Sequence, residues 1–233
     1  MLDVHTHILP GMDDGSRNPE QSLAMLARQT QQGVNTVVLT PHYDAAREAP
    51  AEFVQRRALA EGALLAALGD ADAPRLLSGA EVAFFEGISS IENPEALCIG
   101  NTGFMLLEMP FCTWSRRMLG ELSILQEVRG VKLILAHVER YRTFQPAGLL
   151  EELRRSGILL QCNTSFFLRW QTRRLALSML RKQMISFVAS DCHGLDHRPP
   201  NLGDAMALIG KKLGSPALDF LQSQEHLLSG GMK

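Results

Sequence analysis

The stretch Thr36-Val37-Val38-Leu39-Thr40-Pro41-His42 decides the fold class, because it joins a buried apolar strand to a proline that ends it. A helix precedes this strand: Asn18 can cap it, Pro19 suits its first turn and Gly33 follows its end. Residues 2–7 form another short strand before that helix. Two strands joined by a helix predict a βαβ unit, in which the strands are parallel.

The same alternation of strand and helix continues along the chain. We expect seven strands, at residues 2–7, 36–40, 75–81, 104–108, 132–136, 158–161 and 185–189. Helices are expected near 19–32, 51–68, 115–128, 146–155 and 171–182, with an irregular stretch and a short helix over 84–103. Near-continuous apolar strands are typical of a parallel sheet covered on both faces, as in a barrel or a doubly wound sheet. Of these two α/β folds we expect the barrel, with seven strands.

Composition narrows the class of protein. The length of 233 residues predicts one domain over residues 1–233. The net charge of −2 argues against a protein that binds nucleic acid. No apolar run is long enough to span a membrane, and the first residues lack the pattern of a signal peptide, so we expect no membrane insertion and a cytoplasmic location. The 4 cysteines lack metal-binding spacing, so we expect free thiols that mostly pack in the core.

Histidine and acidic side chains recur at or just after the ends of the expected strands. In a parallel barrel these ends share one face, which is the usual place for catalysis. A His-x-His motif alone arises often by chance, whereas the complete pattern does not. We therefore take nine residues as candidate metal ligands: His5, His7, Asp14, His42, Glu81, Glu108, His137, Asp191 and His193.

The four carboxylates in this set would repel one another and raise each other's pKa unless cations lay between them. Two divalent ions would cancel their charge, and three would leave a positive surplus that suits an anionic substrate. Mixed histidine and carboxylate ligands favour Mn²⁺, Fe or Zn²⁺ over Mg²⁺ or Ca²⁺. We expect two or three divalent transition-metal ions.

Four motifs contain most of these candidate ligands: Asp3-Val4-His5-Thr6-His7, Thr40-Pro41-His42, Gly79-Ala80-Glu81 and Ser190-Asp191-Cys192-His193. They resemble the PHP (polymerase and histidinol phosphatase) superfamily of metal-dependent phosphoesterases. Two further stretches, residues 8–16 and His137-Val138-Glu139-Arg140-Tyr141, resemble the bacterial capsule-type protein tyrosine phosphatases associated with exopolysaccharide synthesis. The chain has Val138 where that subgroup usually has proline, and Cys192 where it usually has alanine.

This resemblance implies a distorted seven-stranded β/α (TIM-like) barrel with three metal ions, for which we expect manganese. It implies that the substrate is a phosphotyrosine-bearing protein, a bacterial tyrosine kinase of capsule or exopolysaccharide synthesis. The ligand sets it implies are His5, His7, Glu81 and Asp191 for one ion, Glu81, Glu108 and His137 for a second, and Asp14, His42 and His193 for the third.

Two arginines complete the expected site. Arg140 and Arg198 flank ligand segments, and their planar donors can grip two phosphate oxygens at once, although a structural salt bridge is the other interpretation of each. Asp196 or His197 could protonate a leaving group. Two alternatives stay open: a small-molecule phosphatase such as a histidinol phosphatase or nucleotide phosphoesterase, and a noncatalytic metal-bound regulatory module. The sequence leaves the oligomeric state open.

Two other groups of side chains have two interpretations each. The basic segment either receives an acidic phosphotyrosine tail or is a solvated helix face, and it comprises Arg169, Trp170, Arg173, Arg174, Arg181 and Lys182. The aromatic group either shapes a pocket or packs in the core, and it comprises Phe144, Phe166 and Phe167. For both groups we favour the structural interpretation.

Overall fold

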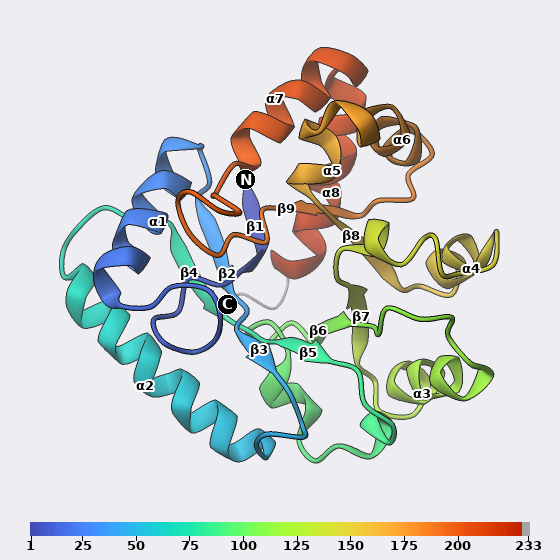
Figure 1. Cartoon of the computed structure of the whole chain (residues 1–233), viewed down its shortest axis with the longest axis horizontal. Helices are drawn as coiled ribbons and strands as arrows, with labels where there is room; N and C mark the ends of the chain where they lie inside the picture. The colour runs from blue at the N-terminus through green and yellow to red at the C-terminus, as the bar shows by residue number, and fades with distance from the viewer. Residues whose placement is uncertain (230–233) are drawn as a thin grey trace.

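The second and third of the seven expected strands are each broken in two in the computed structural model, which describes residues 1–229 (Figure 1). Strand β2 (Thr36–Leu39) resumes after Pro41 as β3 (His42–Tyr43), and β4 (Arg75–Ser78) resumes as β5 (Glu81–Ala83). Pro41 causes the first break because it has no backbone N–H to donate to a neighbouring strand. The other strands stay whole: β1 (Leu2–Thr6), β6 (Phe104–Glu108), β7 (Lys132–Leu135), β8 (Leu159–Asn163) and β9 (Phe187–Ala189).

All strands pair in parallel and form a closed ring. One sheet has the order β1-β2-β4, and the other has the order β3-β5-β6-β7-β8-β9. The broken strands join the two sheets on one side. On the other side β1 meets β9: the Asp191 N–H donates to the His5 carbonyl at 3.0 Å, and the His7 N–H donates to the Cys192 carbonyl at 2.9 Å. The expected seven-stranded β/α barrel is therefore confirmed, and the two breaks are its distortion.

Helices surround the ring of strands (Figure 1). The five expected helices are confirmed to within about three residues at either end. The remaining elements are shorter or lie near the C-terminus, and two 3₁₀ turns occupy the irregular stretch. The helices are α1 (Pro19–Gln31), α2 (Pro50–Leu68), α3 (Arg116–Glu127), α4 (Leu149–Arg155), α5 (Thr164–Leu168), α6 (Trp170–Arg181), α7 (Leu202–Leu213) and α8 (Ser215–Ser229), with 3₁₀ turns η1 (Ile88–Ser90), η2 (Pro94–Leu97) and η3 (Val138–Arg140). Within residues 1–229, no helix is both long and apolar enough to cross a membrane.

Two apolar clusters support the barrel. The larger lies between the strands and the helices. The smaller fills the barrel with side chains from β1, β2 and β6 to β9, among them Val4, Leu106 and Ile134, and Leu228 of α8 joins it. Because apolar side chains occupy the interior, the polar side chains gather at the carboxyl ends of the strands, as expected for this fold.

Candidate metal centre

A bulge in β1 turns His5 toward the interior of the barrel. Asp3 pairs with Val37 and Thr6 with Leu39, so β1 has one residue more than β2 over this stretch. Strict alternation would place His5 on the same face as Asp3, which accepts a hydrogen bond from Gln29 of α1. His5 instead contacts Gln161 inside the barrel, with Nδ1 3.2 Å from Oε1. The ring of His7, two residues further on, meets the ring of His5, with their Nε2 atoms 3.1 Å apart.

The loop after β1 holds His7. Nδ1 of His7 lies 2.7 Å from the Asp13 carboxylate, which also accepts hydrogen bonds from the backbone N–H groups of Gly15 and His42. Gly15 passes so close to His7 that a Cβ atom would lie 2.2 Å from the His7 carbonyl oxygen. Only glycine can therefore occupy this turn without displacing the ligand.

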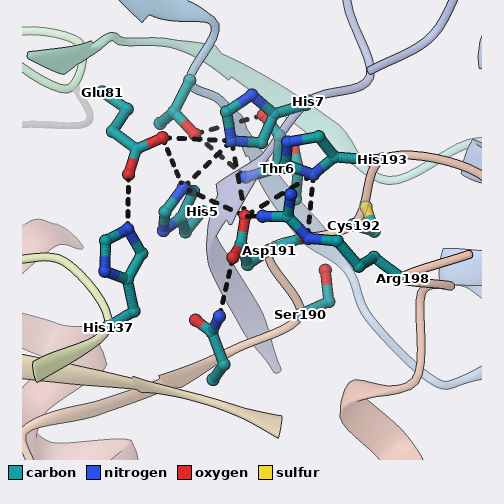
Figure 2. A network of polar contacts seen from close by, with 12 residues as sticks. His5, Thr6, His7, Glu81, His137, Ser190, Asp191, Cys192, His193 and Arg198 are labelled. Carbon is teal, nitrogen blue, oxygen red and sulfur yellow. Dashed lines mark hydrogen bonds and ion pairs between the residues drawn. The ribbon is translucent and has the colours of Figure 1, made fainter. Parts of the chain in front are cut away.

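The four atoms expected to share one ion converge at the barrel mouth (Figure 2). Nε2 of His5 and Nε2 of His7 lie 3.1 Å apart, and both lie 3.1–3.5 Å from Oε2 of Glu81 and Oδ1 of Asp191. Atoms bound to one ion at about 2.1 Å lie about 3.0–3.4 Å from one another. The spacing of the two nitrogens and the Glu81 oxygen thus fits a common metal ion, and Asp191 Oδ1 lies 3.5 Å from both nitrogens.

Hydrogen bonds at the opposite ring nitrogens support this fit. Nδ1 of His5 faces the amide oxygen of Gln161, and Nδ1 of His7 faces the carboxylate of Asp13. Both partners accept, so Nδ1 of each ring is the donor and Nε2 is the atom left to bind an ion. These two nitrogens and the two carboxylate oxygens lie together at low cost when positive charge lies between them, as a metal ion or as protons.

The other predicted ligands lie beside this group. Nε2 of His137, which follows β7, lies 2.9 Å from Glu81 and 3.4 Å from Glu108. The exposed Asp14 carboxylate lies 3.5 Å from Nε2 of His42 and 3.3 Å from Nε2 of His193.

All nine candidate ligands therefore lie in one connected cluster. Three of its subsets could each hold an ion: His7, Asp14, His42 and His193; His5, His7 and Glu81; and His42, Glu81 and Glu108. The nitrogen Nε2 of His193 is buried without a hydrogen-bond partner, which is the condition expected of an atom that binds a metal.

Without metal ions, protons on the histidine rings supply the positive charge of the cluster. Burial lowers the pKa of His7, but its hydrogen bonds with Asp13 and Glu81 outweigh burial and raise the pKa to about 10. Burial likewise lowers the pKa of His137, while hydrogen bonds with Glu108 and Glu81 raise it to about 9. The pKa of His193 falls to about 4, because of burial and the nearby positive charges. Metal binding would therefore compete with protons at His7 and His137.

Both predicted arginines contact the same ligand. Arg140 Nη2 lies 2.8 Å from Oδ2 of Asp191, and Arg198 Nη2 lies 2.5 Å from Oδ1. Both arginines also line a cavity of about 490 Å³. Their salt bridges use one nitrogen each, so further N–H groups of either side chain stay available to a ligand. Three non-glycine residues of this region, His137, Asp191 and Arg198, have positive φ angles, a strained conformation that concentrates at functional sites.

Cys192 and Arg198 are separated by five residues, the spacing of the thiolate loop in cysteine-dependent tyrosine phosphatases, which our interpretation of the cysteines overlooked. The structure excludes that chemistry. Cys192 is fully buried, and its Sγ lies 3.8 Å from Gln29 of the outer helix α1. Burial and the charge of Asp3 raise the pKa of its thiol far above the ordinary value. The prediction that all 4 cysteines are free is confirmed, with Cys112 exposed and the other three buried.

Of the proposed proton donors, basic residues and aromatic residues, some line the cavity and others have only structural contacts. His197 and Arg169 line the cavity, whereas Asp196 is exposed and no contact brings it to the cluster. Arg173 donates to carbonyls at the end of α5, which is a structural role. Phe167 is fully buried and Phe144 is exposed, so neither shapes this cavity, but Phe166 forms part of its wall.

Three residues of the centre were not predicted from the sequence. Asp13 accepts a hydrogen bond from His7. Gln161 and Asn163, two buried amides of β8, contact the candidate ligands His5 and Asp191. Asp13 adjoins the predicted ligand Asp14, so the choice between the two acids depended on the loop geometry. The two amides did carry a signal, because polar residues at i and i+2 of an otherwise apolar strand face the same side.

Comparison with known proteins identifies the family. Residues 1–226 match the family of capsular polysaccharide synthesis proteins CpsB/CapC. This chain belongs to the CpsB/CapC family. It is 31% identical over 232 residues to the tyrosine-protein phosphatase CpsB of Streptococcus pneumoniae, with 92% of each chain covered. It is 27% identical to the tyrosine-protein phosphatase YwqE of Bacillus subtilis, with 98% of this chain and 91% of YwqE covered.

A solved CpsB/CapC structure has the same fold. It comes from a crystallographic study of YwqE from Bacillus subtilis and CpsB from Streptococcus pneumoniae, described as unique metal-dependent tyrosine phosphatases. The TM-score is 0.79 at 25% sequence identity, with 98% of this chain and 94% of that chain covered. The expected resemblance to the capsule-type phosphatases is thus confirmed.

Proposed function

We propose that this CpsB/CapC protein is a metal-dependent tyrosine-protein phosphatase that uses the nine-residue cluster as its active site. The observation that carries the proposal is the convergence of His5, His7, Glu81 and Asp191, in which both histidine Nε2 atoms lie 3.1–3.5 Å from one oxygen of each carboxylate. Such a set binds a cation, and cations at this position would neutralise a phosphate dianion.

The cluster holds two or three divalent transition-metal ions, with Mn²⁺ as the proposed metal and Fe or Zn²⁺ as alternatives. The first ion takes His5, His7, Glu81 and Asp191. Glu81 also faces His137 and Glu108, which together would hold the second, and Asp14, His42 and His193 would hold a third. Ions bound there lower the pKa of water and orient phosphate oxygens.

Arg140 and Arg198 orient the phosphate. Both guanidinium groups are anchored on Asp191 and about one-third exposed, so they are fixed at one end and open to the cavity at the other. Bidentate donors bind two phosphate oxygens with a defined geometry, and they stabilise the charge of the transition state. The buried Asp191 carboxylate keeps both side chains in place for this role.

The cavity beside the two arginines accommodates the tyrosine-bearing segment. Its volume of about 490 Å³ is in the range of small-ligand sites, and Phe166 and Arg169 lie in its wall. The phenol of tyrosine has a pKa of about 10, far below that of the serine hydroxyl. Phenolate therefore leaves more readily than the alkoxide of a phosphoserine and needs less protonation. His197, which also lines the cavity, is the proposed proton donor where one is needed.

The proposed substrate is a bacterial tyrosine kinase of capsule or exopolysaccharide synthesis. The family description as capsular polysaccharide synthesis proteins supports this choice. We place the activity in one domain, residues 1–233, of which the last four lie outside the described residues. The 4 free cysteines suit the reducing cytoplasm, where we place the enzyme.

Substrate competition tests the proposal. Matched phosphotyrosyl and phosphoseryl peptides, histidinol phosphate and a nucleotide monophosphate are compared at equal concentration with Mn²⁺ supplied. The phosphotyrosyl peptide should have the highest kcat/KM, and elemental analysis should find two or three transition-metal ions per chain. A clear preference for histidinol phosphate or the nucleotide would overturn the protein-phosphatase assignment. A single bound ion would overturn the proposed cluster.

A further inference from the structure

Among the strands of residues 1–229, β8 contributes no candidate ligand, yet it lies between two strands that do. It pairs with β7, which His137 follows, and with β9, which Asp191 follows. The inward positions at its carboxyl end are the amides Gln161 and Asn163, which are 0% and 4% exposed. These two side chains, which we call the amide pair, contact three ligands that come from three other strands.

One backbone group sets the direction of every hydrogen bond in the amide pair. The N–H of His137 points at Gln161 at 2.7 Å, and a backbone N–H can only donate. The atom of Gln161 that receives it must be the amide oxygen. The amide nitrogen of Gln161 is then the donor to Asn163 Oδ1, at 2.9 Å. The nitrogen of Asn163 in turn donates to Oδ2 of Asp191, at 2.6 Å.

This direction determines which nitrogen of His5 can bind an ion. The oxygen of Gln161 also lies 3.2 Å from Nδ1 of His5, and an amide oxygen only accepts. The hydrogen of the neutral His5 ring therefore sits on Nδ1. Its lone pair is on Nε2, which faces His7, Glu81 and Asp191.

The same chain of bonds orients Asp191. The bonds from Asn163 and Arg140 both end on Oδ2, at 2.6 and 2.8 Å. The other oxygen, Oδ1, is thereby turned toward the ring nitrogens of His5 and His7, 3.5 Å from each. Asn163 thus helps the two arginines to fix the orientation of the Asp191 carboxylate.

We propose that the amide pair Gln161–Asn163 is a positioning device for the metal centre, which holds the lone pair of His5 Nε2 and the Oδ1 atom of Asp191 toward one shared ion. The inference rests on the proposed metal-dependent function and adds two residues that act through the ligands rather than by binding the ion. Partners of metal ligands commonly change metal affinity by about 10- to 100-fold when they are removed.

The experiment measures Mn²⁺ affinity directly by calorimetric titration of chelator-treated protein, together with the melting temperature of the metal-free protein. Gln161→Leu removes both the acceptor and the donor. Gln161→Glu keeps an oxygen for His5 and for the His137 N–H, replaces the donor to Asn163 with a second acceptor oxygen, and adds a negative charge. Cys162→Ala is the matched control, because Cys162 is a buried β8 residue in the cluster between strands and helices.

We expect Gln161→Leu to weaken Mn²⁺ binding at least about tenfold, and Gln161→Glu to restore most of that loss. Cys162→Ala should lower the melting temperature and leave Mn²⁺ affinity unchanged. If Gln161→Leu fails to fold, Asn163→Ala provides the test, since Asn163 borders the cavity and water can fill the space it leaves. It too should weaken Mn²⁺ binding.

Wild-type Mn²⁺ affinity in a folded Gln161→Leu or Asn163→Ala variant would overturn the inference, because the amides would then only satisfy one another in the core. Absence of divalent-ion binding by the wild-type protein would overturn the proposed function and this inference with it. The two failures are thus distinguishable.

Discussion

His42 and Glu81 are partners in the parallel register of β3 and β5, and their side chains meet with Nδ1 of His42 3.1 Å from Oε2 of Glu81. The contact exists because the pairing of the two broken strands resumes after Pro41 in the same register, with Leu39 opposite Ser78 before the break and His42 opposite Glu81 after it. The other ring nitrogen of His42 faces Asp14 at 3.5 Å. His42 therefore links Glu81 to Asp14 and belongs to both candidate ligand groups that contain these acids.

Removal of a bridging ligand should abolish most of the activity. We expect His42→Ala and His137→Ala each to lower kcat at least about tenfold and to reduce the metal content of the purified protein. Elemental analysis and phosphatase assays measure both effects, and circular dichroism should show an intact fold. His226→Ala, at an exposed position of α8, is the control. Full activity of either ligand variant would contradict the assignment.

Arg198→Lys separates charge from geometry. Lysine keeps the positive charge, and the left-handed backbone of residue 198 strains lysine and arginine equally. Lysine cannot, however, donate to two oxygens from one plane. We expect kcat/KM for phosphotyrosyl peptides to fall about tenfold or more with metal content unchanged. Unchanged kinetics would show that Arg198 serves only its salt bridge with Asp191.

Arg169 should affect the binding of protein substrates rather than the chemical step. It lies in the cavity wall and is exposed, so it can meet acidic residues that flank a phosphotyrosine. We expect Arg169→Ala to raise KM for an acidic phosphotyrosyl peptide several-fold and to leave kcat and the hydrolysis of a small aryl phosphate unchanged. Arg174→Ala, at an exposed position of the adjacent helix α6, should change neither. Equal effects of both variants would contradict a specific role.

Cys192→Ser tests whether the thiol of Cys192 acts as a nucleophile. The buried thiol stays protonated at neutral pH, since burial raises its pKa, so it cannot act as a nucleophile. We expect kcat to change less than about threefold, with some loss of stability from the buried hydroxyl. Complete inactivation with metal and fold retained would instead point to a thiol mechanism.

The stability of the metal-free protein should fall as the pH rises. The pKa of His7 is raised to about 10 and that of His137 to about 9 in the folded state, against about 6.5 in the unfolded chain. Their stabilising contribution is therefore complete below about pH 6.5 and is lost as the pH rises toward 9–10. Urea titrations between about pH 6.5 and 8.5, before unfolded cysteines ionise, should show a decreasing free energy of unfolding.

Asp13→Asn provides the control for this pH dependence. It removes the carboxylate 2.7 Å from Nδ1 of His7, so the pKa of His7 should return toward its ordinary value and the slope should become shallower. A slope that is unchanged in Asp13→Asn would assign the effect to other groups.

Much of this protein follows from its sequence alone. Helix caps such as Asn18 and continuous apolar strands are local patterns, so they predicted the order of strands and helices and hence the barrel. Polar residues at the ends of apolar strands also pointed to a site, so the nine candidate ligands could be named before any coordinates.

The tertiary structure alone decided how those ligands are aimed. The bulge that turns His5 inward depends on how β1 pairs with β2, and the contact of His42 with Glu81 depends on the register in which β3 pairs with β5. The roles of Gln161 and Asn163 depend on the N–H of His137, a group from another strand that fixes which end of each amide donates. A sequence specifies local conformation and polarity, whereas the direction of a buried hydrogen bond is set only when distant strands bring donor and acceptor together.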